Sequence, residues 1–143
     1  MKILMRPLLI GAALLFASPV AAGETPAPDG AKLYIISPAD GAKLTSPVKV
    51  VFGLRGMGVA PAGVEKENTG HHHLLIDTPL PAGEALNEAI AQDAQHLHFG
   101  GGQTEAMVEL KPGKHTLQLL LGDHNHIPHK APVASDVVSI TVE

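Results

Sequence analysis

The chain has 143 residues, of which 45% are hydrophobic and 17% are charged, with a formal net charge of −4. This length suits one domain with one core, and the hydrophobic content argues against intrinsic disorder. The lack of cysteine excludes disulfides, thiolate metal sites and a cysteine nucleophile. The acidic balance argues against nucleic-acid binding, which depends on lysine and arginine. Histidine is unusually frequent, with nine residues against ten lysines and arginines.

Residues 1–22 have the pattern of a secretory signal peptide. Lys2 and Arg6 precede an apolar run that ends at Phe16, and small residues follow up to Ala22. A transmembrane helix needs about 20 apolar residues, so an uncleaved anchor is the weaker interpretation of this shorter run. We expect cleavage after Ala22 and export to the periplasm or the medium, with no membrane segment left. Removing both basic residues makes the mature chain more acidic.

The remaining chain is punctuated by glycine and proline at short intervals. Residues 23–30 are rich in proline, glycine and charge, which predicts a flexible lead. Residues 31–143 predict a single all-β domain, an antiparallel β-sandwich of the immunoglobulin-like kind with long loops and at most one short helix. The expected strands are short apolar or alternating runs over residues 33–37, 48–54, 72–77, 104–110, 115–121 and 136–142.

Three connections carry separate expectations. Residues 56–70 hold several glycines and predict a long loop. Residues 83–95 are rich in alanine and acids and predict a short helix, although its apolar stripe is thin. The Pro-Gly turn within residues 111–114 predicts a hairpin between the strands on either side of it.

Eight of the nine histidines fall into three clusters about 25 residues apart. They lie at residues 71–73, at 96 and 98, and at 124, 126 and 129, whereas His115 stands alone at the start of a strand. Alternate residues of a strand share one face, so His71 and His73 are expected together, with His72 on the opposite face. A sandwich can bring such pairs from different hairpins to one end, where several imidazoles could bind one metal ion. The predicted ligands are His71, His73, His96, His98, His124 and His126, with His72, His129, Asp77 and Asp123 in reserve.

Other interpretations of these residues stay open. The histidines could form a structural hydrogen-bonded network. Asp77 and Asp123 could be ligands, acceptors for ring N–H groups, or turn residues. The glycines at 100–102 directly follow His98; they could allow close approach to a site or form a flexible connection.

Five segments together resemble one family of exported bacterial proteins. They are SPADGAKLTSP (37–47), FGLRGMGVAPAG (52–63), NTGHHHLLID (68–77), HLHFGGGQTE (96–105) and HTLQLLLGDHNHIPH (115–129). The chain is similar to family 4399 of domains of unknown function. This resemblance implies a small periplasmic β-rich domain with histidine motifs and carries no activity. The SPADG segment is also similar to the start of small periplasmic copper-resistance β-sandwiches, which place histidine at the mature N-terminus, where this chain is expected to have Gly23.

Three functions follow as hypotheses. The first is an exported metal-binding protein, with copper ahead of zinc, acting in metal storage, delivery or tolerance. The second is a non-catalytic envelope binding module with a structural histidine network, although few aromatic residues are present to stack on sugars. The third is a zinc hydrolase with Glu105 or Asp77 as general base, for which no H-E-x-x-H spacing exists. The two non-catalytic hypotheses are favoured over the hydrolase, and whether the protein is an enzyme stays open.

Overall fold

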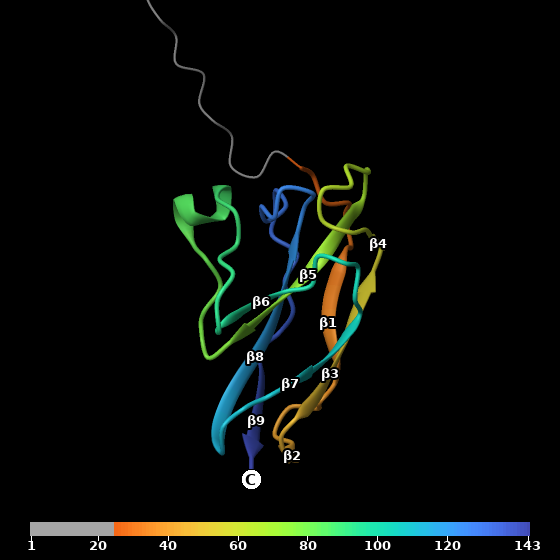
Figure 1. The fold of residues 1–143 in the computed structure, drawn as a ribbon. Helices are drawn as coiled ribbons and strands as arrows, with labels where there is room; N and C mark the ends of the chain where they lie inside the picture. Colours follow the sequence, from red (N-terminus) through yellow and green to blue (C-terminus); the bar gives the residue numbers. More distant parts are fainter. Residues whose placement is uncertain (1–24) are drawn as a thin grey trace, which may run out of the picture.

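The computed structural model describes residues 25–143, so the predicted signal peptide and its cleavage after Ala22 lie outside the described residues. The described chain forms two β-sheets packed face to face (Figure 1). The predicted fold class, an antiparallel β-sandwich of the immunoglobulin-like kind, is confirmed. Within residues 25–143, no helix is long and apolar enough to cross a membrane.

The smaller sheet has three strands in the order β1-β3-β7, and both pairings are antiparallel. The strands are β1 (Lys32–Ser37), β3 (Val48–Arg55) and β7 (Glu105–Val108). Side chains alternate between the two faces, so Val50 and Phe52 of β3 are buried while Lys49 is exposed. The period-two pattern of the sequence therefore directs one face of this sheet into the core.

The larger sheet has the strand order β2-β9-β8-β5-β4, and β6 also pairs with β5. The strands are β2 (Lys43–Leu44), β4 (Gly58–Val59), β5 (Thr69–Ile76), β6 (His96–His98), β8 (Gly113–Gly122) and β9 (Val138–Val142). The central pairings are antiparallel, whereas the two-residue strands β2 and β4 pair in parallel at the ends of the order.

The hydrophobic core fills the space between the two sheets. The smaller sheet contributes buried side chains such as Val50 and Phe52, and the larger sheet contributes the inward-facing leucines of β8. These leucines are Leu117, Leu119 and Leu121, each with no exposed surface. Burial of one such side chain stabilises the fold by about 1.5–3 kcal/mol. Packing of side chains between the two sheets is therefore the main source of stability.

The outer face of β5 and β8 is also covered, by the segments that follow these strands. Leu75 of β5 and Leu120 of β8 form a second buried cluster with Ile90, which lies in the connection between β5 and β6. The Ile90 N–H donates to the carbonyl of His126, which ties this connection to the loop after β8. Outward-facing residues of β5 are therefore enclosed rather than exposed to solvent.

Two predicted elements are wrong. In place of a helix over residues 83–95 there is a five-residue 3-10 helix, η1 (Gly83–Asn87), with no buried residue, followed by irregular chain. A thin apolar stripe offers too little burial to stabilise a longer helix. The predicted hairpin is also wrong, because β7 pairs with β3 in the smaller sheet while β8 lies in the larger one. The Pro-Gly turn at residues 111–114 thus connects two sheets.

The ends of other predicted segments also differ from expectation. The predicted loop over residues 56–70 contains β4 and the first residues of β5. The predicted flexible lead is described only from Thr25, and from there it docks on the domain: the N–H of Lys130 donates to the Thr25 carbonyl, at 2.9 Å. Ala27 packs against the core. Docking of Thr25 on a partner that lies 105 residues further along the chain leaves no local pattern in the sequence.

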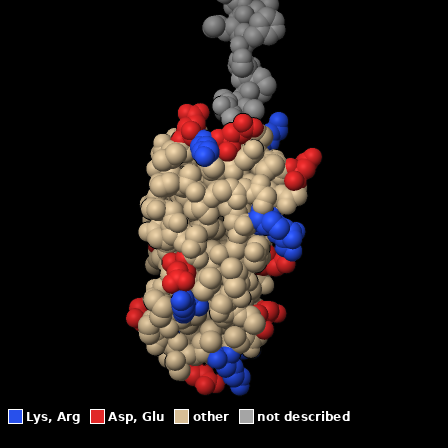
Figure 2. All heavy atoms as spheres, turned by 90° about the vertical axis from the view of Figure 1, so that its right-hand side faces the viewer, with Lys and Arg blue, Asp and Glu red and all other residues tan. Residues whose placement is uncertain are grey.

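The charged side chains are dispersed. Figure 2 shows a face with scattered blue and red groups, mostly near its margins, and a large uncharged area between them. Lysine and arginine do not gather into a patch on this face. On this side of the molecule, the surface therefore agrees with the sequence argument against nucleic-acid binding.

Candidate metal centre

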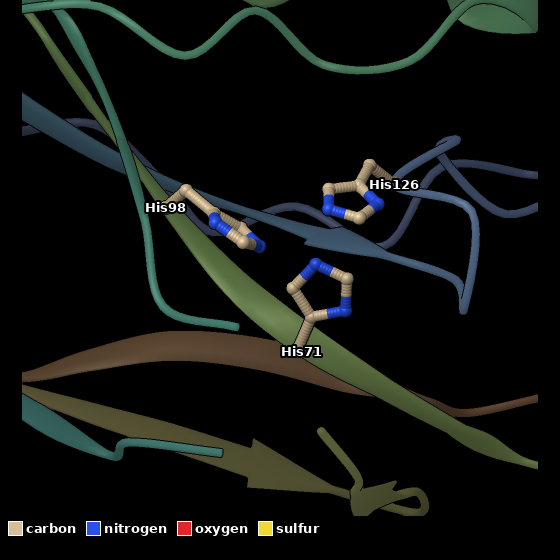
Figure 3. Close-up of side chains that lie close together, drawn as sticks. All are labelled: His71, His98 and His126. Atoms are coloured by element: carbon tan, nitrogen blue, oxygen red, sulfur yellow. The ribbon is translucent and has the colours of Figure 1, made fainter. Parts of the chain in front are cut away.

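Four histidines from three parts of the chain meet on the outer face of the larger sheet. His71 and His73 lie on β5, His98 on β6, and His126 in the loop after β8. One ring nitrogen from each of His71, His98 and His126 lies within 4.8 Å of the other two (Figure 3). The Nε2 atoms of His71 and His73 are 3.0 Å apart. We refer to these four residues as the histidine cluster.

Strand geometry and register explain three of the four positions. His71 and His73 share one face of β5 because they are two residues apart, as predicted. His98 is the direct partner of His73 in the antiparallel β5–β6 pairing. The ring centroids of His98 and His73 are consequently 5.0 Å apart, as are those of His98 and His71. The sheet therefore assembles three rings without help from a loop.

A tight turn supplies the fourth ring. His126 has a positive φ of 69°, in the left-handed region that few non-glycine residues adopt. Its N–H donates to the carbonyl of Asp123, and its own carbonyl accepts from the N–H of Ile90. Such backbone conformations cost about 1–3 kcal/mol and persist where the surrounding structure holds them, often at functional sites. The turn directs the His126 ring to 4.7 Å from that of His98, centroid to centroid.

Two glycines leave room for the rings. A Cβ atom on Gly122 would lie 2.9 Å from Nε2 of His73, and a Cβ on Gly100 would lie 2.4 Å from Cε1 of His98. Both distances are below those that real side chains tolerate. Gly100 opens the glycine run that follows β6, so close approach to a ring is the interpretation of this run that the structure favours.

Substitution of Gly122 by alanine is expected to disturb the cluster. The added methyl group would press on His73 and would also lie 3.3 Å from Cα of His126. We expect Gly122→Ala to destabilise the folded protein by about 1–3 kcal/mol, a typical cost of overpacking, and to shift the ring resonances of both histidines. Urea unfolding and histidine-selective NMR would measure both effects, and unchanged ring resonances would contradict the assigned packing.

Burial keeps the imidazoles of His71, His73 and His98 neutral. His71 and His73 have no exposed surface, whereas His98 and His126 are partly exposed. Burial and the neighbouring His126 and His98 rings lower the pKa of His71 to about 4. Burial and the adjacent His71 lower the pKa of His73 to about 3. The pKa of His98 is lowered by burial and by His126. Neutral imidazole is the form that binds metal ions.

Several buried ring nitrogens of the cluster have no hydrogen-bond partner among the described residues. They are Nδ1 of His71, Nδ1 of His73 and Nε2 of His98. A buried polar atom left unpaired costs about 1–3 kcal/mol, so such atoms need an explanation. In Figure 3 the rings of His71, His98 and His126 each turn one nitrogen toward the space between them. An electron-pair acceptor in that space would supply a partner for Nε2 of His98, which is buried without one.

The spacing is compatible with a small cation. Imidazole nitrogens bind Zn²⁺ at about 2.0–2.1 Å, which places two ligands of a tetrahedral ion about 3.3 Å apart. The 3.0 Å separation of the Nε2 atoms of His71 and His73 is close to that value. The converging nitrogens of His71, His98 and His126 lie within 4.8 Å of one another, so an ion would draw them closer by up to about 1.5 Å. The donors are all imidazoles, which suit zinc, copper and nickel.

Two predicted ligands lie outside the cluster. His96 is the partner of Leu75 in the β5–β6 pairing, and its Nδ1 donates to Asp93, at 2.8 Å. His124 lies two residues before His126, but its Nε2 accepts from the side-chain amide of Asn125, at 3.0 Å. The turn at this point removes the strand alternation that was expected to bring His124 and His126 to one face.

The two reserve histidines are buried in other places. His72 faces the core, where its ring centroid lies 5.0 Å from that of Phe52, and burial lowers its pKa to about 4. Its position on the opposite face from His71 and His73 is as predicted. His129 is also buried, and its Nε2 donates to the carbonyl of Thr69, at 3.1 Å. Neither ring belongs to the group of converging nitrogens.

The two reserve aspartates have structural contacts. Asp77 ends β5 and accepts from Nδ1 of His115, at 2.7 Å, and from the N–H of Thr116. His115 also donates from Nε2 to the carbonyl of Lys111. The bond to Asp77 raises the pKa of His115 the most, and the bond to Lys111 raises it further. Asp123 accepts from backbone N–H groups of its own loop. Neither carboxylate is among the converging metal-ligand atoms.

Comparison with known families places the chain. The model of one protein family, described as "Domain of unknown function (DUF4399)", matches residues 50–143. The chain belongs to this family. The matched range contains all four residues of the histidine cluster and the loop that carries His126.

Other comparisons add little to this DUF4399 member. No curated protein matches its sequence significantly. Among solved structures, one described as "Structures of Clostridium thermocellum CbhA fibronectin(III)-like modules" is similar, with a TM-score of 0.39 and 16% sequence identity. The similarity covers 79% of this chain and 46% of that one, so the chain spans about half the length of its structural neighbour.

Proposed function

We propose that this DUF4399 protein is an exported metal-binding protein in which His71, His98 and His126, with His73 beside them, hold one copper or zinc ion. The observation that carries the proposal is the convergence of three ring nitrogens within 4.8 Å of one another. The three residues come from two strands and a loop that are distant in the sequence. Chance proximity of exposed side chains does not account for a group whose first member is wholly buried.

The protonation state of the cluster supports metal binding. The lowered pKa values of His71, His73 and His98 keep these three rings neutral at pH 7, so each has a lone pair available on one nitrogen. Nε2 of His98 is buried without a partner among the described residues, although such an atom normally has one. Coordination of an ion by this nitrogen would supply the missing interaction.

The donor set favours copper over zinc. Imidazole is a ligand of intermediate softness, and for a given nitrogen site copper stands at the top of the divalent affinity series. Thiolates, which would favour zinc in a Cys-rich site, are absent from the sequence. In an exported protein, storage, delivery or tolerance of copper is the role that such a site would serve.

A structural histidine network is the second candidate, and one contact favours it. The 3.0 Å separation of the Nε2 atoms of His71 and His73 allows one ring to donate its proton to the other without an ion. If the histidines form such a network, chelators should not change the stability of the protein. The zinc-hydrolase hypothesis gains no support, because Asp77 is bonded to His115 and Glu105 pairs with Lys49 on the other sheet.

Calorimetric titration of the metal-free protein with Cu²⁺ and Zn²⁺ tests the proposal. We expect at least one site tighter than about 1 µM. The double variant His98→Asn/His126→Asn should lose this site, because it removes two of the three converging ligands. The variant His96→Asn/His124→Asn is the matched control: it removes the same number of histidines from outside the cluster and should keep the affinity.

Two results would overturn the proposal. One is the same affinity in the cluster variant as in the original protein, and the other is no binding tighter than about 1 µM in the original protein. If neither result is found, elemental analysis of untagged protein purified from its native compartment would identify which metal occupies the site.

A further inference from the structure

The loop that carries His126 is built around one carboxylate. Asp123 follows β8 directly and is 97% buried, with an exposed fraction of 3%. Its Oδ1 atom accepts from the N–H of Asn125, at 2.8 Å, and from the N–H of Ile127, at 3.0 Å. Its own N–H donates to the Ile127 carbonyl, and its carbonyl accepts from the N–H of His126. The turn that orients His126 therefore depends on Asp123 at four points.

Thr25 and Pro26, which precede β1, contact the loop over residues 123–130. Oγ1 of Thr25 donates to Oδ2 of Asp123, at 2.6 Å, across a sequence separation of 98 residues. The Thr25 carbonyl accepts from the N–H of Lys130, and Pro26 forms a β-bridge with Lys130. Thr25 thus holds the loop at both of its ends. It lies outside the range that matches the family model.

His126 is the only cluster member that depends on this loop. The other three rings are placed by β5 and β6, whose register fixes them. The backbone of His126 is in the left-handed region, so its orientation has to be held by its surroundings. The contacts of Asp123 and Thr25 contribute to holding it, together with the bond from Ile90 and the bond from the Gly63 N–H to the His124 carbonyl.

We propose that Asp123 and Thr25 are positioning residues of the metal site: the docked N-terminal segment fixes the Asp123 carboxylate, and this carboxylate sets the turn that presents the His126 ring. The proposal rests on the proposed function. Residues that orient a metal ligand without touching the metal commonly contribute 10–100-fold to metal affinity. The metal affinity of the cluster is therefore coupled to a hydroxyl group that contacts none of its rings.

The pair Thr25→Val and Thr25→Ser in the full chain tests this coupling. Valine keeps the shape of threonine and removes the hydroxyl group, whereas serine retains it. We expect Thr25→Val to weaken Cu²⁺ binding about tenfold and to change the nitrogen hyperfine pattern in the copper EPR spectrum, because one imidazole is less firmly held. Thr25→Ser should bind as the original protein does, with the same spectrum.

Substitution of Asp123 extends the test. Asp123→Asn keeps the Oδ1 acceptor for the two loop N–H groups, and its NH2 group in the place of Oδ2 can donate to Oγ1 of Thr25, so it should retain most of the affinity. Asp123→Ala should lose 10–100-fold. Circular dichroism checks that the alanine variant is folded. If it is not, the comparison of Thr25→Val with Thr25→Ser tests the positioning role alone.

The outcomes separate the two proposals. If the original protein binds copper and Thr25→Val binds it equally well with an unchanged spectrum, the positioning role is wrong and the metal site stands. If the original protein binds neither copper nor zinc, the proposed function fails and the positioning role fails with it. In the metal-free protein, a shift of the His126 ring resonances in Thr25→Val but not in Thr25→Ser supports the positioning role independently of affinity.

Discussion

Copper at a hundredfold excess over its dissociation constant is expected to stabilise the folded protein by about 2.7 kcal/mol. An ion that binds the assembled cluster but not the unfolded chain shifts the folding equilibrium by mass action. The four rings come from three separate parts of the chain, so the site does not survive unfolding. For a domain of this size the stabilisation corresponds to a rise in Tm of about 10 °C.

Thermal unfolding followed by circular dichroism, with and without copper, measures this shift. An unfolded chain with nine histidines also binds copper, which would reduce the effect. The matched pair of double variants corrects for this binding, since His98→Asn/His126→Asn and His96→Asn/His124→Asn have equal numbers of histidines. Only His96→Asn/His124→Asn should keep the copper-dependent rise in Tm. A rise of equal size in both variants would assign the stabilisation to scattered surface histidines.

Acid is expected to destabilise the metal-free protein steeply below pH 6.5. The pKa values of His71 and His72 are lowered to about 4 and that of His73 to about 3, against 6.5 in the unfolded chain. A lowered folded-state pKa means that the unfolded chain binds protons first as pH falls. The stability that these neutral residues contribute is therefore complete above pH 6.5 and decreases as pH falls toward 4.

The expected slope is large. Each histidine that titrates only in the unfolded state changes the free energy of unfolding by about 1.4 kcal/mol per pH unit. Three such residues give a few kcal/mol per pH unit, which is a large part of the 5–15 kcal/mol that a domain of this kind has in total. Urea unfolding at pH 7, 6 and 5 measures the slope, and we expect extensive unfolding near pH 4–5.

His72 and His115 provide controls of opposite kinds. The variant His72→Phe replaces a core imidazole beside Phe52 with a group that does not titrate, so its slope should be shallower by about a third. His115 has a raised pKa, so its bond to Asp77 contributes fully below pH 6.5 and is lost as pH rises through the folded-state value. It cannot cause instability in acid. Equal stability at pH 7 and pH 5 would contradict the burial of the three neutral rings.

Much of the fold follows from local patterns. All six predicted strands exist, because the alternation of apolar and polar residues is a property of the extended chain itself. The short strands β2, β4 and β6 were missed, because two or three residues carry too little pattern. Of the predicted helix over residues 83–95 only the 3-10 helix η1 forms, because a thin apolar stripe offers too little burial for a longer one.

In the candidate site, too, part of the arrangement follows from local pattern and part from tertiary structure. The sequence by itself determined that His71 and His73 face one side of a strand and His72 the other, since successive side chains alternate. Only the tertiary structure decided that His98 and not His96 joins them. The β5–β6 register pairs His98 with His73 and leaves His96 opposite Leu75. Register depends on contacts between distant segments, which no spacing within one segment can specify.

The loop after β8 shows the same distinction for the last ring. From the spacing alone, His124 and His126 were equivalent, and Asp123 was a candidate ligand. The structure turns the chain around the Asp123 carboxylate, presents His126 and directs His124 to Asn125. The carboxylate is itself held by Thr25, from the other end of the described chain. Residue types and strand periodicity thus supplied the imidazoles, and long-range packing selected which of them converge.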